Sequence, residues 1–227
     1  MTVEPIPSPP NMGRAFISHD PRNRGYPVRA LLPTDQSLIT KVHRRGGAYN
    51  QGSTSQCVAY TAKGMLNTAP FSAAEPYNRR SGYSTDVFYI EAQRRDQWPG
   101  EAYDGTSAQG VLAYLTETQI IGEYRWCFGL DDLLRTLAFH GPVSIGAWWR
   151  GGMSSPSTSG ALVSYSGSYL GGHQFEAFGV HPGREEVEFM NSWGTDWGDR
   201  GRFRMKFSEV EKMLAEDADA HTLITVN

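Results

Sequence analysis

Cysteine is the strongest candidate nucleophile in this chain, and one of its two cysteines has a sequence context suited to chemistry. Cys57 follows a loop of glycine and small polar residues, 51–56, and begins a segment whose apolar residues recur at helical spacing. We expect Ser55 to cap this helix and Cys57 to lie in its first turn. A helix N-terminus carries partial positive charge, which favours a thiolate and can stabilise an oxyanion. The alternative is a small buried core residue, the commonest fate of a single cysteine.

The second cysteine, Cys127, lacks these features. It lies between Trp126 and Phe128 without a glycine-rich approach, so we expect it to be a core residue. A disulfide between Cys127 and Cys57 is conceivable, but two cysteines cannot form the multi-bridge framework of small secreted domains. The chain therefore offers one candidate nucleophile.

A catalytic thiol needs a base within hydrogen-bond reach, and the base needs a group that orients it. Of the six histidines, His173 is the one whose position predicts such a group. It begins a predicted strand, 173–180, which a turn near Pro182 joins to a return strand, 186–190. A turn centred there pairs residues whose numbers sum to about 365, so the partner of His173 should be residue 191 or 192, which brings it beside Asn191. The oxygen of an asparagine side chain can accept the imidazole N–H and fix its tautomer.

The segments around these residues resemble those of one family. Residues 191–198 read Asn-Ser-Trp-Gly-Thr-Asp-Trp-Gly and resemble the segment N-S-W-G-x-x-W-G of papain-like (C1-type) cysteine peptidases. Gln51-Gly52-Ser53 followed by Cys57 resembles the Q-G-S-x-x-x-C segment of the same family, with the same interval from Gln to Cys. The likeness covers about 21–226, and from Arg29 onward the chain is similar to bacterial members that lack a long pro-region.

The resemblance implies a role for each matched residue. Cys57 would be the nucleophile, His173 the general base, and Asn191 the group that orients the imidazole. The side-chain N–H of Gln51 and the backbone N–H of Cys57 would form the oxyanion hole, and Trp193 would cover the hydrogen bond between histidine and asparagine. No metal or cofactor is implied, since the sequence has no paired ligand spacing such as C-x-x-C or H-E-x-x-H.

Three departures from the family pattern concern the surroundings of the site. The usual C-G-S-C-W is replaced by Thr54-Ser55-Gln56-Cys57-Val58, which removes a disulfide cysteine and a tryptophan next to the nucleophile. Gly172 precedes the histidine where many members have Asp or Asn, which leaves the pH dependence open. None of these changes removes a catalytic group.

Composition limits the other possibilities. The 227 residues carry a formal net charge of −3 and 39% hydrophobic residues, which is ordinary globular composition and gives no electrostatic reason to expect nucleic acid binding. No stretch approaches the roughly 18 apolar residues of a membrane-spanning helix, and the proline-rich segment 1–10 does not read as a signal peptide. We therefore expect a cytoplasmic protein with reduced thiols, or a virion-associated one if the source is viral.

The pattern of elements predicts an α+β protein. Helices are expected from Cys57, after a capping box of Thr106 with Gln109, near 130–139, and at 208–214 after a capping box of Ser208 with Glu211. Strands are expected at 143–149, 161–165, 173–180, 186–190, 202–207 and 222–226.

The resemblance implies the two-lobed papain-like fold, with the active-site cleft between its lobes. An extended N-terminal arm would cover 1–28 and a catalytic domain 29–227. Within that domain a helical lobe, about 50–140, would pack against an antiparallel β-barrel-like lobe, about 141–227.

The leading functional hypothesis is hydrolysis of peptide bonds in peptide or protein substrates through a thioester intermediate. A peptide ligase, an isopeptidase or a cell-wall amidase could use the same Cys57, His173 and Asn191. A different class of function is a papain-fold scaffold or virion component that has little activity and binds an assembly partner.

Overall fold

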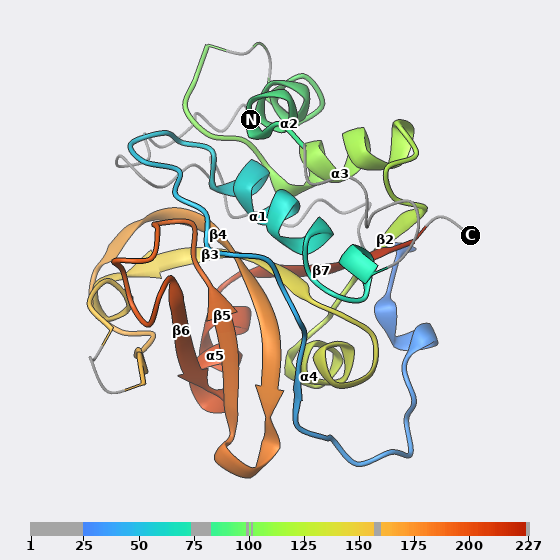
Figure 1. Cartoon of the computed structure of the whole chain (residues 1–227), viewed down its shortest axis with the longest axis vertical. Helices are drawn as coiled ribbons and strands as arrows, with labels where there is room; N and C mark the ends of the chain where they lie inside the picture. The colour runs from blue at the N-terminus through green and yellow to red at the C-terminus, as the bar shows by residue number, and fades with distance from the viewer. Residues whose placement is uncertain (1–24, 74–82, 99, 101, 157–159, 226–227) are drawn as a thin grey trace.

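Helices dominate the first half of the chain and strands the second, as the sequence predicts (Figure 1). The computed structural model describes residues 25–73, 83–98, 100, 102–156 and 160–225. The α-helices are α1 (Cys57–Leu66), α2 (Thr85–Gln93), α3 (Ala108–Glu117), α4 (Leu130–Phe139) and α5 (Phe207–Ala215). The strands are β1 (Lys41–Val42), β2 (Glu123–Trp126), β3 (Val143–Arg150), β4 (Tyr169–His181), β5 (Glu186–Met190), β6 (Arg202–Lys206) and β7 (Asp219–Ile224).

All the strands join one antiparallel sheet of seven strands in the order β2-β7-β3-β4-β5-β6, and β1 pairs with β4 away from this path. The predicted α+β class is confirmed. Among the described residues, no helix has the length and apolar character needed to cross a bilayer.

Two hydrophobic clusters fill the interior. One lies between α1, α2, α3 and β2, where Met65, Phe88 and Leu112 are almost completely buried. The other lies on the sheet under α4 and α5, and Phe175 and Leu137 belong to it. Helix α4 thus packs with the sheet, although the predicted lobe boundary near 140 assigned it to the helical part.

Helix α1 joins the two clusters because one face of it packs on β4. A Cβ atom added to Gly64 of α1 would come within 2.7 Å of Oε2 of Glu176 on β4, so a larger residue there would have to displace this carboxylate. Glu176 is buried, and its Oε2 accepts hydrogen bonds from Nη2 and Nε of Arg45 at 3.0 and 3.2 Å. Oγ1 of Thr68 donates to the other oxygen. The buried carboxylate is therefore compensated from two segments that flank α1.

Replacing Arg45 with alanine should destabilise the protein by about 3–5 kcal/mol, because Glu176 would stay buried without its counter-charge. The side chains of Arg45 and Glu176 are only 7% and 2% exposed. Denaturant unfolding measures the change. Arg200→Ala is the matched control, since that side chain is 77% exposed and its loss should change the unfolding free energy by less than about 0.5 kcal/mol. Equal effects of the two substitutions would contradict the prediction.

The helix starts expected from sequence are correct to within a few residues, but the capping residues are wrong. Gln56, not Ser55, precedes α1, and no side chain caps this helix. Ser107 caps α3 by accepting from the backbone N–H of Gly110 at 3.1 Å, which displaces Thr106 from that role. Lys206 precedes α5, again without a side-chain cap, so the capping box expected at Ser208 is absent.

Segment 161–165 is not a strand, although its composition favours one. It forms an isolated bridge between Leu162 and Arg204, and the backbone N–H of Tyr165 donates to the carboxylate of Glu209 at 2.7 Å. A side chain of α5 therefore takes the place of a ladder partner. Strand β7 begins at Asp219, three residues earlier than expected, and α2 and β2 were not predicted.

Candidate active site

The hairpin of β4 and β5 brings the predicted base to its predicted orienting group, although the register differs from that expected. Glu176 pairs with Met190, one residue from the expected partner, and Val180 pairs with Val187, two residues from it. The turn is longer than expected, since it includes Glu185 in a left-handed conformation. An irregularity between Ala177 and Gly179 then shifts the register back by one residue toward the expected pairing. Nε2 of His173 lies 2.8 Å from Oδ1 of Asn191.

A second hydrogen bond fixes the direction of the first. Oδ1 of Asn191 also accepts the backbone N–H of Ser192 at 2.8 Å. An amide turned the other way would place its NH₂ group against this N–H, so the oxygen must face both donors. His173 therefore carries its proton on Nε2, and Nδ1 keeps the lone pair that can accept a proton. Nδ1 is buried and has no hydrogen-bond partner among the described residues.

Aromatic rings enclose the imidazole of His173. The ring of Trp149 meets it edge to face with centroids 5.1 Å apart, and the ring of Trp193 lies at 5.0 Å with an angle of 35°. Trp149 and Trp193 also contact each other and Trp197, whose indole N–H donates to the carbonyl of Ser154. Burial lowers the pKa of His173 to about 4, and the hydrogen bond to Asn191 only partly offsets this effect. The imidazole is therefore neutral near pH 7.

Cys57 is the first residue of α1 and is completely buried. It precedes Gly64 by seven residues, about 10 Å and two turns along the same helix face. His173 precedes Glu176, which faces Gly64, by three residues, or about 10 Å of strand. The packing of α1 on β4 thus places the thiol-bearing helix start near the strand that holds His173. No side chain caps α1 and its first turn holds no acidic residue, so nothing within that turn offsets the partial positive charge of the helix start.

Gln51 is held by both ends of its side-chain amide. Its Oε1 accepts a hydrogen bond from the hydroxyl of Ser192, and its Nε2 donates to the carbonyl oxygen of Thr54 at 2.7 Å. The backbone N–H of Gln51 donates to the carbonyl of Ser192 at 2.8 Å, and Asn50 forms a bridge with Trp193. These contacts fix the orientation of the amide and leave its second N–H as a donor. They also tie the loop before Cys57 to the segment that carries Asn191.

Cys127 has a different environment. It is buried beside Oγ1 of Thr136, 3.5 Å from its sulfur, and burial raises the pKa of its thiol to about 12. Such a thiol is not a nucleophile near neutral pH. Neither cysteine forms a disulfide.

Comparison with solved structures identifies the architecture. Xylellain, a cysteine protease from Xylella fastidiosa, has a TM-score of 0.72 with 16% identity, and the match covers 100% of both chains. Digestive procathepsin L2 proteinase from the larval midgut of Tenebrio molitor has a TM-score of 0.62 with 15% identity, over 96% of this chain and 78% of that one. The chain has the papain-like cysteine protease fold.

A third papain-like structure, proCathepsin B S9 from Trypanosoma congolense, matches with a TM-score of 0.61 and 14% identity over 94% of this chain and 87% of that one. Among curated sequences, Pro-cathepsin H of Medicago truncatula is 27% identical over 192 residues, which is 70% of this chain and 53% of the relative. The chain therefore spans about half the length of that relative. No protein-family model matches the sequence.

Two residues that sequence reasoning did not single out shape this papain-like site. Ser192 holds the amide of Gln51 through its hydroxyl and the amide of Asn191 through its backbone N–H. Trp149 packs against the imidazole of His173 from β3. Ser192 belongs to the recognised motif and could have been found there, whereas Trp149 has no sequence signal beyond its place in a strand.

Proposed function

We propose that the chain is a papain-like cysteine peptidase that hydrolyses peptide bonds in peptide or protein substrates through a thioester on Cys57. The observation that carries the proposal is the pair of hydrogen bonds to Oδ1 of Asn191, which puts the proton of His173 on Nε2. A neutral imidazole held in this tautomer has a basic Nδ1, as a general base requires. The family resemblance and the shared fold support the same reaction.

The reaction follows from these groups. Nδ1 of His173 takes the thiol proton of Cys57, and the sulfur forms a bond to the substrate carbonyl carbon. The imidazolium then gives its proton to the leaving amine as the carbon–nitrogen bond breaks, which leaves a thioester. Water attacks the thioester while Nδ1 accepts its proton, and the proton returns to sulfur as the carbon–sulfur bond breaks. The products are an amine and a carboxylic acid.

Because the imidazole of His173 is buried, its protonation depends on the charge of the Cys57 sulfur. With a neutral thiol beside it, the imidazolium is disfavoured, as the lowered pKa of His173 indicates. A thiolate on Cys57 would supply the opposite charge that stabilises the imidazolium. The start of α1 would stabilise the thiolate at the same time. The two charges would therefore form together, by transfer of the thiol proton of Cys57 to Nδ1 of His173.

Labelling with a thiol-directed peptide epoxide tests this proposal. The reagent should modify Cys57 in the folded protein, and peptide mapping should find Cys127 unmodified because the raised pKa of its thiol keeps it protonated. Labelling of Cys127 before Cys57, or no labelling of either thiol in folded protein, would refute the proposed nucleophile. A ligase or amidase would also be labelled, so cleavage of a peptide in water completes the test.

Gln51 is proposed to donate its remaining side-chain N–H to the oxyanion, together with the backbone N–H of Cys57. Gln51→Ala should lower kcat by about 10²-fold with little change in KM, because the donor acts on charge that develops in the transition state. Gln51→Glu is the matched variant, since it keeps the size and an acceptor for Ser192 but has no N–H. Near-normal kcat in the glutamate variant would exclude the donor role.

A further inference from the structure

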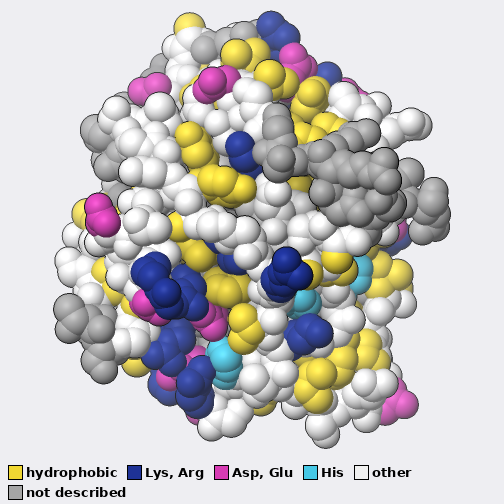
Figure 2. Space-filling view, viewed as in Figure 1, with side chains coloured by type: hydrophobic (Ala, Val, Ile, Leu, Met, Phe, Trp, Pro, Cys, Tyr) yellow, Lys and Arg dark blue, Asp and Glu magenta, His cyan; other side chains and the backbone are white. Residues whose placement is uncertain are grey.

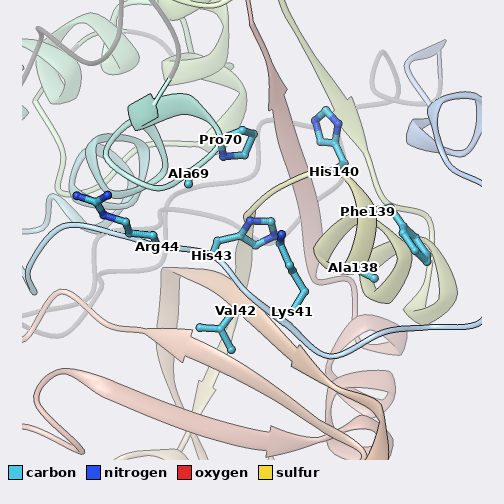
Figure 3. A pocket seen from close by; sticks show the side chains of 9 residues that line it. All are labelled: Lys41, Val42, His43, Arg44, Ala69, Pro70, Ala138, Phe139 and His140. Atoms are coloured by element: carbon cyan, nitrogen blue, oxygen red, sulfur yellow. The ribbon is translucent and has the colours of Figure 1, made fainter.

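A cavity of about 350 Å³ lies between the β1 segment, the C-terminal end of α4 and the turn at Pro70 (Figure 3). Ala69 and Pro70 follow the last turn of α1, whereas Cys57 begins this helix of 10 residues. A helix of that length spans about 15 Å. The cavity is therefore at the end of α1 away from the candidate active site and is a separate feature.

The cavity is cationic, and none of the described residues that line it is acidic. Lys41 and Arg44 line it, both are exposed, and neither forms an ion pair with any described residue. Every other described arginine or lysine has a carboxylate partner except Lys63, which lies over the ring of Tyr49. Two uncompensated cations in one cavity favour a bound anion.

Two histidines also line this cavity. Nε2 of His43 lies 2.8 Å from the carbonyl oxygen of Leu137, and Nε2 of His140 lies 3.1 Å from that of Leu223. Since a carbonyl only accepts, both rings carry a proton on Nε2, and His43 occupies a carbonyl near the negative end of α4. Burial lowers the pKa of His43, and the charges of Lys41 and His140 lower it further. None of the described residues that line the cavity offers a carboxylate to Lys41 or Arg44.

The remaining walls are apolar. Val42 is 46% exposed and, together with Pro70 and Phe139, lines the same cavity. Figure 3 shows Lys41 extending beside the ring of His43, and Arg44 extending outward from the rim. Figure 2 shows basic and histidine side chains beside yellow apolar ones at and right of the centre of the face, whereas the basic side chains further left lie beside acidic ones. A phosphate group alone would occupy only a small part of this volume.

We infer that this cavity binds a small organic phosphate monoester, with its phosphoryl group between Lys41 and Arg44 and its organic part against Val42, Pro70 and Phe139. A phosphate monoester carries a charge of about −1.5 to −2 near pH 7, which matches two uncompensated cations better than one carboxylate does. The Arg44 side chain is exposed and can turn over the opening, since such rotamers change within nanoseconds. Its planar guanidinium suits two-point contact with phosphate.

Calorimetric titration of the intact protein with phenyl phosphate, inorganic phosphate and benzoate tests the inference. Phenyl phosphate should bind more tightly than the other two, because only it offers both two charges and an apolar ring. Its affinity should fall at least about tenfold in Lys41→Gln and in Arg44→Gln, and should weaken with added salt. Both substitutions are at exposed positions, and thermal unfolding verifies that the variants are folded.

Lys63→Gln is the matched control. It removes a lysine that also has no carboxylate partner among the described residues but lies outside this cavity, so the affinity should not change. Absence of phenyl phosphate binding at millimolar concentration would overturn the inference. Equal weakening by Lys63→Gln, or equal affinity for benzoate or inorganic phosphate, would also overturn it. The readout is binding and not catalysis, so its outcome is independent of the proposed peptidase activity.

Discussion

Replacing Cys57 with alanine is expected to lower kcat/KM for peptide hydrolysis by at least about 10⁴-fold. The thioester path requires a sulfur nucleophile, and alanine leaves only the oxyanion donors and substrate binding to accelerate attack by water. The remaining groups act as a unit with the nucleophile, so their own contributions are largely lost with it. Fluorogenic peptide hydrolysis measures the rate, and a titration with the peptide epoxide measures the remaining active thiol.

Cys127→Ala provides the matched control in the same protein. That thiol is buried against Thr136 and has no role in the proposed reaction, so kcat should change less than twofold while stability falls modestly. Loss of activity in folded Cys127→Ala with retention in Cys57→Ala would reverse the assignment. Retention of activity in both variants would show that hydrolysis does not proceed through a cysteine.

The pairing of His173 with Asn191 is the part of the site that sequence predicts best, because the distance of two residues from a hairpin turn determines whether they lie opposite each other. The observed register differs from the central expectation by one to two residues. The turn is longer, with Glu185 in a left-handed conformation, and the strand pairing is irregular after Ala177. The residue types of the turn do not determine these backbone conformations. The side chains still meet because an imidazole and an amide reach beyond their own ladder positions.

The setting of Gln51 could not be predicted, because it depends on two segments that are distant in the chain. Residues 49–51 pair with 192–194 through backbone hydrogen bonds, and the hydroxyl of Ser192 then reaches the amide of Gln51. Local patterns give no information on such an approach. The same limit explains segment 161–165, where Glu209 of α5 binds a backbone N–H that a neighbouring strand would otherwise use.

Thr54 shows how a departure from the family pattern is accommodated. It stands where the resemblance places a disulfide cysteine, and its hydroxyl and backbone N–H both donate to the carbonyl of Gln51, at 2.6 and 3.2 Å. Its own carbonyl accepts from the side chain of Gln51. The loop before Cys57 is therefore closed by hydrogen bonds in place of a covalent bridge, and the closure acts on the residue proposed to bind the oxyanion.

Asn191→Ala is expected to lower kcat by about 10³- to 10⁴-fold while KM changes little. Without Oδ1 the imidazole of His173 loses the acceptor that fixes its proton on Nε2, and a ring in the other tautomer has no lone pair on Nδ1. Steady-state kinetics and denaturant unfolding on the same samples separate this loss from instability. The fall in the unfolding free energy should stay near 1–3 kcal/mol, as for a lost buried hydrogen-bond partner.

Asn191→Asp is the control that separates orientation from mere packing. Aspartate keeps an acceptor for both His173 and Ser192, so the Nε2–H tautomer is retained and kcat should exceed that of the alanine variant by at least about tenfold. Its negative charge should also raise the pKa of the imidazole, which would move the acidic limb of the kcat/KM profile to higher pH. If the alanine and aspartate variants had equal kcat and unshifted pH profiles, Asn191 would be a packing residue. The hydrogen bond to His173 would then have no part in catalysis.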